Sequence, residues 1–157
     1  MAVVVEDDLA VEIVGVKGAG AGDPQDVLRQ NIEAADVQAL AEKNILPGTK
    51  MEIGFTPVIV NTGNEVVLFD SGNGSSRGPT RGQLLKSIGA AGYSADQIDV
   101  LVITHFHPDH IGGLMDGDKP AFKNARYVTG EAEYNFWTSK KLADSADDKM
   151  KPRIELV

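Results

Sequence analysis

The chain has 157 residues, of which 42% are hydrophobic, and this is enough for one domain with a substantial core. Its formal net charge of -8 disfavours nucleic-acid binding, because such binding needs clustered Lys and Arg. The absence of cysteine excludes disulfides, thiolate metal sites and cysteine nucleophiles.

No stretch of the sequence approaches the roughly 18 consecutive apolar residues that a membrane span needs. Met1–Val5 is too short for the apolar region of a signal peptide, and acidic residues follow it at once. We therefore expect neither a membrane nor a nucleic-acid partner. The compartment stays open: the cytoplasm is favoured, and the periplasm would require a signal that has already been removed.

The first elements in chain order are a strand, a break and a helix. Leu9–Val16 is a predicted strand, and Gly18–Gly22 is a predicted flexible loop. This loop lacks the Gly-Lys-Ser/Thr that a phosphate-binding loop would require. Asp23 then caps a predicted helix or helix pair that has Pro24 at its first position.

The middle of the chain reads as two strands, a helix and a third strand. Phe55–Asn61 and Glu65–Asp70 are predicted strands joined by a tight turn, and the second lacks alternation, so both of its faces should be buried. Thr80 can cap the predicted helix Arg81–Ala91, and a capping box then begins at Ser94.

The apolar run Val100–Ile103 is the next predicted strand. Together with Glu65–Asp70 and the helix between them it forms a strand–helix–strand unit, so the two strands should be parallel. Ligands of such sheets gather at the carboxyl ends of the strands, and both Asp70 and His105 fall there.

All three histidines of the chain lie within six residues, directly after this strand. In an extended segment His105 and His107 point the same way and can converge on one ion. Pro108 suits the first turn of a helix, which would bring Asp109 and His110 back toward the same cavity. A single histidine is usually a packed core or surface residue, but this cluster favours a site for zinc, or for iron or manganese.

Five further segments follow the histidine cluster. We predict a short helix at Ile111–Met115, a strand at Arg126–Thr129 and a helix at Gly130–Lys140. Leu142–Lys149 is polar and is expected to be a solvated helix or a disordered tail, and Arg153–Val157 looks like the start of another strand.

The segment Thr104–Gly113, THFHPDHIGG, resembles the HxHxDH signature of the metallo-β-lactamase-fold hydrolases. It is most similar to the branch of N-acyl-homoserine lactonases and methyl-parathion-hydrolase-like enzymes, and the resemblance covers residues 31–137. It implies an α/β fold with α+β layers, the N-terminal half of an αββα sandwich. Residues 1–157 would then be one metallo-β-lactamase-like domain that is truncated.

The resemblance also implies ligand roles for the cluster. His105 and His107 would bind a first zinc ion, and Asp109 and His110 would bind a second. Iron or manganese could replace zinc. Asp109 is in addition the predicted catalytic residue. Asp70 would support the metal loop from behind, against the alternative that it only forms a turn.

Aromatic residues wall the substrate pocket in relatives of this branch, so Phe136 and Trp137 are candidates for that role. Ordinary core packing is the alternative for each of them.

The implied function is a metal-dependent hydrolase that uses a metal-activated water on an ester-like bond of a small molecule, with a lactone or a phosphotriester favoured. The later histidines and bridging aspartate of complete relatives have no counterpart here, and Asp144, Asp147 and Asp148 read as surface charge. A homodimer or a chain supplying the second half is therefore expected. The alternatives are a catalytically silent metal-binding or oligomerising fragment and a mononuclear iron oxygenase of the same fold.

Overall fold

The computed structural model describes residues 2–6, 9–15, 18–22, 33–46, 48, 51–74, 81–148, 150–155 and 157. The chain divides into two compact units. One unit is Ala19–Phe55, and the other combines Met1–Gly18 with Thr56–Val157.

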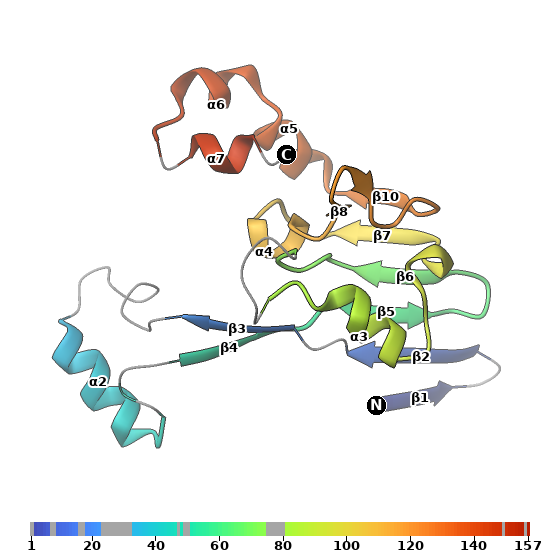
Figure 1. Cartoon of the computed structure of the whole chain (residues 1–157), viewed down its shortest axis with the longest axis horizontal. Helices are drawn as coiled ribbons and strands as arrows, with labels where there is room; N and C mark the ends of the chain where they lie inside the picture. Colours follow the sequence, from blue (N-terminus) through green and yellow to red (C-terminus); the bar gives the residue numbers. More distant parts are fainter. Residues whose placement is uncertain are drawn as a thin grey trace. The chain divides into compact units, whose positions relative to one another are not determined.

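A six-stranded sheet forms the larger unit (Figure 1). Its order is β1-β2-β5-β6-β7-β10, in which neighbours are antiparallel from β1 to β6 and parallel from β6 to β10. The strands are Ala2–Glu6 (β1), Leu9–Gly15 (β2), Val58–Asn61 (β5), Val66–Phe69 (β6), Val100–Ile103 (β7) and Arg126–Thr129 (β10). The mixed α/β architecture and the parallel pairing of β6 with β7 are confirmed.

Helix α3 (Leu84–Ala90) lies over one face of this sheet, as Figure 1 shows. Ile59, Leu68 and Leu101 are aligned across three neighbouring strands, and all three are fully buried. Ile88 of α3 belongs to the same hydrophobic cluster. The helix between the parallel strands thus packs onto the sheet and buries one side of both strands.

The opposite sheet face is also apolar. Val58, Phe69, Val102 and Val128 are aligned across β5, β6, β7 and β10. Phe69 and Val128 of this row are exposed to solvent, at 37% and 41%. Association is the usual role of a large exposed apolar surface.

The remaining elements of the larger unit are short. They are η2 (Ala95–Gln97), α4 (Pro108–Ile111), β8 (Met115–Asp116), β9 (Lys119–Pro120), α5 (Glu131–Trp137), α6 (Lys140–Ser145) and α7 (Lys151–Ile154). The capping box predicted at Ser94 is present before η2, where the Gln97 side chain accepts the Ser94 N–H at 2.8 Å.

The smaller unit contains α2 (Ala34–Lys43) and a two-stranded sheet of β3 (Gly18–Gly22) and β4 (Met51–Phe55). The prediction that Gly18–Gly22 is a loop was wrong, and β4 was not predicted. Strand pairing uses backbone N–H and C=O groups, so a partner strand can pair with glycine-rich backbone despite its weak propensity. The helix start expected at Asp23 and Pro24 lies outside the described residues.

Two predicted helices differ from the structure. Helix α3 begins at Leu84 and not at Arg81, because Gly82 adopts a left-handed φ of 68° that a helix cannot continue through. The predicted cap Thr80 lies outside the described residues. The helix that Pro108 was predicted to start is α4, Pro108–Ile111, and because it ends at Ile111 the short helix expected at Ile111–Met115 is wrong.

The C-terminal predictions are partly wrong. The helix expected over Gly130–Lys140 breaks at Thr138, where Ser139 caps the next helix by accepting the Leu142 N–H at 3.2 Å. The strand expected from Arg153 is the short helix α7. None of the helices in the described part of the chain is long and apolar enough to cross a membrane.

Candidate metal centre

The histidine cluster lies at the carboxyl ends of the parallel strands β6 and β7. Asp70 directly follows β6, and Thr104 directly follows β7. The Asp70 N–H donates to the carbonyl of Val102 at 2.9 Å, so the strand pairing continues to the edge of the site. Asp70 has a left-handed φ of 60°, a conformation that aspartate tolerates better than most residues and that turns its carboxylate out of the strand.

The three imidazole rings are neighbours. The ring centroid of His105 lies 3.8 Å from that of His110 and 4.6 Å from that of His107. His107 stands at the start of α4, and Pro108 begins the helix, so the chain turns back and brings His110 to the other two. Asp109 Oδ2 lies 3.5 Å from His110 Nε2. The strand-to-helix turn thus gathers all three histidines and Asp109.

Asp70 fixes the orientation of His110. Its Oδ2 lies 2.8 Å from His110 Nδ1, and its Oδ1 accepts the Thr104 N–H at 2.8 Å. An ionised carboxylate only accepts, so the proton of this pair belongs on His110 Nδ1. In the neutral imidazole the unprotonated nitrogen is then His110 Nε2, the atom that lies 3.5 Å from Asp109 Oδ2.

Burial lowers the pKa of His105 below its ordinary value of 6.5. The neighbouring His110 and His107 lower that pKa further, while Asp70 and Asp109 oppose the shift. The lowered pKa favours the neutral imidazole near pH 7. This is the form that coordinates a metal ion.

The donor set has the chemistry of a zinc site, because it combines imidazole nitrogens with a carboxylate and has a carboxylate behind one imidazole. Within the described ranges, however, no group of three or more His, Cys, Asp or Glu is arranged so that it could hold an ion as it stands. The ligand roles of His105, His107, Asp109 and His110, and the catalytic role of Asp109, stay predictions.

Two supporting residues were not predicted from the sequence. Ser71 is fully buried, and its hydroxyl donates to the His110 carbonyl at 2.9 Å and accepts the Gly113 N–H at 3.2 Å. Glu133 accepts the Phe106 N–H at 2.8 Å. The only signal for Ser71 was its place beside Asp70 at a strand end, and none marked Glu133.

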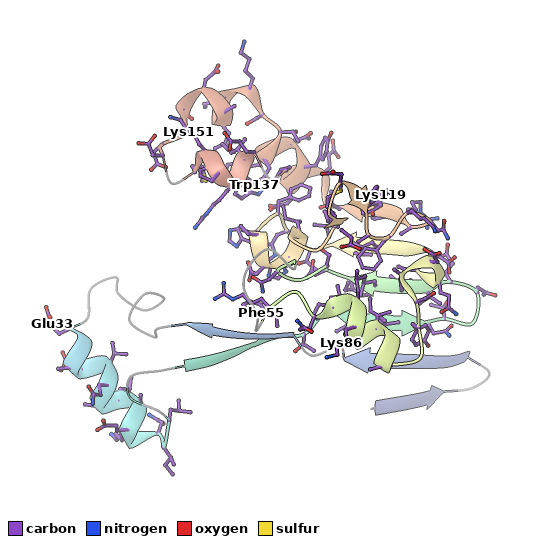
Figure 2. The ribbon with its side chains drawn as sticks, in the orientation of Figure 1. Glu33, Phe55, Lys86, Lys119, Trp137 and Lys151 are labelled. Atoms are coloured by element: carbon purple, nitrogen blue, oxygen red, sulfur yellow. The ribbon has the colours of Figure 1, made fainter. Side chains whose placement is uncertain are left out.

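The two predicted pocket residues have different surroundings. Trp137 is 5% exposed and belongs to the hydrophobic core, while its ring lies edge-on to His107 with centroids 6.2 Å apart. Figure 2 shows it on α5. Phe136 is 50% exposed and packs edge-on against Trp137. Contact of either ring with a substrate stays a prediction.

The backbone after the motif lies directly against the loop that follows β6. A Cβ built on Gly113 would overlap the Ser71 carbonyl oxygen, and one built on Gly112 would overlap the carbonyl of Asn73. Gly112 and Gly113 therefore allow the two loops to approach closely.

We expect Gly113→Ala to destabilise the protein by about 2 kcal/mol, because overpacking against backbone forces a shift that costs about 1–3 kcal/mol. Urea unfolding would measure the loss. Gly89→Ala is the matched control, since a Cβ there meets nothing within 4 Å and alanine favours the helix by roughly 0.5–1 kcal/mol. Equal unfolding midpoints for Gly113→Ala and the unaltered chain would contradict the close approach.

Fold and site together define a mixed α/β protein that carries a histidine-rich loop at the carboxyl ends of two parallel strands. The profile of the Metallo-beta-lactamase superfamily matches residues 56–155, and the chain belongs to this superfamily.

Two of the similar solved structures match nearly the whole chain. One is AidC, described as a dizinc quorum-quenching lactonase in complex with a product, with 26% identity and a TM-score of 0.77 over 96% of this chain and 51% of that one. The other is the hydrolase AbOPH of the beta lactamase superfamily, with 25% identity and a TM-score of 0.77 over 98% of this chain and 54% of that one. The chain thus spans about half the length of these structures.

The chain is also similar to a short part of a longer protein. The Integrator complex subunit 11 homolog of Dictyostelium discoideum is 36% identical over 123 residues, which cover 62% of this chain and 16% of that protein.

Proposed function

We propose that the protein is a metal-dependent hydrolase of an ester-like bond, or the metal-binding half of such an enzyme. The observation that carries this proposal is the convergence of His105, His107 and His110 at the ends of β6 and β7, with Asp70 behind them. Membership of the metallo-β-lactamase superfamily and the likeness to a dizinc lactonase support it.

His105 and His107 would hold a first ion, and Asp109 and His110 a second; zinc is the expected metal, with iron or manganese as substitutes. When bound, such ions lower the pKa of a water to about 7 and polarise a carbonyl or phosphoryl group. The chain's own residues prepare this site: Asp70 keeps the proton on His110 Nδ1 so that Nε2 stays available. The buried Trp137 ring lies edge-on to His107, with centroids 6.2 Å apart.

The proposed substrate is a small molecule with a lactone or a phosphotriester bond. The likeness to AidC, a lactonase by its description, supports the lactone, and the sequence resemblance to the lactonase and methyl-parathion-hydrolase-like branch supports both. A second half from a further chain, or from another copy, would complete the ligand set.

A catalytically silent metal-binding module is the second candidate. It is favoured by the finding that the described residues include no group of three or more side chains that could already hold an ion. Metal binding is common to both candidates, and turnover separates them.

We expect zinc to bind the protein saturably in isothermal titration calorimetry, and the His105→Ala/His107→Ala variant to lose the tighter part of that binding. Asp144→Ala is the control, because Asp144 is an exposed acid on α6, away from the motif. If the unaltered chain and the His105→Ala/His107→Ala variant gave the same zinc titration, the metal site would be contradicted. Oxygen uptake with an iron-loaded protein and a persulfide would instead indicate the oxygenase alternative.

A further inference from the structure

Glu133 connects helix α5 to the histidine loop through one oxygen atom. Its Oε1 accepts the Trp137 indole N–H at 2.7 Å and the Phe106 backbone N–H at 2.8 Å. Trp137 lies one turn further along the same helix, whereas Phe106 is 27 residues earlier in the chain. A single carboxylate oxygen therefore hydrogen-bonds both to its own helix and to the histidine loop.

The hydrogen bond from the Phe106 N–H acts on the backbone between two predicted ligands. Phe106 separates His105 from His107, and its side chain is buried in the core. The hydrophobic core thus holds the Phe106 ring, and Glu133 holds the Phe106 N–H. Because the orientation of this peptide group sets the directions of the flanking side chains, it fixes how His105 and His107 point.

The hydrogen bond from the Trp137 indole acts through an aromatic ring. The indole of Trp137 is locked by its bond to Glu133 and stands at 83° to the His107 imidazole, with centroids 6.2 Å apart. If the Trp137 indole were displaced, the His107 ring would lose its edge-on contact with it. Both bonds of Glu133 thus restrict His107, one through the backbone of the preceding residue, Phe106, and one through the neighbouring Trp137 ring.

We propose that Glu133 is the positioning residue for His107, and through it for the first ion of the predicted site. This inference rests on the proposed function. Glu133 acts by the reach of its oxygen and not by its charge. Glu131 lies in the same first turn of α5 with the same charge but is exposed, so it separates the two effects.

Two substitutions distinguish reach from charge. Glu133→Asp keeps the charge but shortens the side chain by one methylene, so its oxygen no longer reaches both N–H groups. Glu133→Gln loses the charge but keeps an oxygen of the same reach, which can accept both bonds. Glu131→Gln is the matched control for charge on this helix.

Affinity for Co²⁺, used as a spectroscopic probe, is measured from its visible absorption and from quenching of Trp137, the single tryptophan of the chain. We expect Glu133→Asp to bind Co²⁺ roughly 10-fold or more weakly, the range for loss of a residue that supports a metal ligand. We expect Glu133→Gln and Glu131→Gln to bind Co²⁺ as tightly as the unaltered chain, because neither loses the hydrogen bonds. If Glu133 only stabilised the fold, Glu133→Asp would unfold at a lower midpoint. Its affinity for Co²⁺, measured under conditions in which the variant is folded, would then be unchanged.

A metal-free measurement separates this inference from the proposed function. In NMR spectra the nuclear Overhauser contact between the Trp137 and His107 rings should be present in the unaltered chain and in Glu133→Gln, and lost in Glu133→Asp. Failure of the unaltered chain to bind Co²⁺ would contradict the proposed function, while loss of the contact in Glu133→Asp would still support the positioning role. An unchanged contact and affinity in Glu133→Asp, or a loss confined to Glu133→Gln, would overturn the inference.

Discussion

The 157-residue chain alone, supplied with zinc or manganese, should hydrolyse an acyl-homoserine lactone or a phosphotriester little above the uncatalysed rate. The reason is the ligand count, because the motif is predicted to supply two ligands to each ion whereas a catalytic zinc normally has three from the protein. No histidine follows His110. The exposed Phe69 and Val128 on the second face of the sheet give a further reason to expect that a partner is needed.

Adding the second half of a dizinc lactonase such as AidC should restore turnover, measured as lactone opening or as release of the phosphotriester's leaving group. His105→Ala or Asp109→Ala should then lower the restored rate by more than the roughly 100-fold that loss of a supporting residue costs. Asp144→Ala should leave it unchanged. Full metal-dependent activity of the purified monomer would show that the missing ligands are dispensable, and the two-ion account would have to be abandoned.

Asp70→Asn should lower the affinity for zinc by roughly 10–100-fold, as loss of a carboxylate behind a metal-binding histidine does. One oxygen of asparagine can still accept the Thr104 N–H, so its amide NH₂ then faces His110 Nδ1. Two donors cannot pair, and the proton of the His110 ring moves to Nε2. The nitrogen that should bind the ion is thereby occupied.

Calorimetric zinc titration measures the affinity, and ¹⁵N spectra of the three histidines report which nitrogen of His110 carries the proton. Asp99→Asn is the matched control. Asp99 accepts the Val66 N–H at 2.8 Å, so it joins the same two strands at their other ends, away from the histidines. An unchanged titration for Asp70→Asn, or an equal loss for Asp99→Asn, would leave Asp70 with a turn-forming role only.

The predictable parts of the site are those encoded by neighbouring residues. The β-branched run Val100–Ile103 is strand β7, and Pro108 starts α4. Together these two features bring His105, His107 and His110 into contact, because a strand followed at once by a helix reverses the chain within a few residues. The family resemblance made Asp70 a candidate, and its place at the same end of a parallel strand as the histidines supported it; its hydrogen bonds to Thr104 and His110 are present.

The tertiary structure decided the contacts between distant segments. Glu133 reaches Phe106 across 27 residues, and Ser71 reaches the His110 carbonyl across 39. The strand Gly18–Gly22 forms only because β4 pairs with its backbone. Such contacts depend on which surfaces pack against each other in the folded chain. The local sequence around each residue therefore does not predict them. The sequence by itself therefore determined the turn that gathers the three histidines, whereas packing decided which residues hold that turn in place.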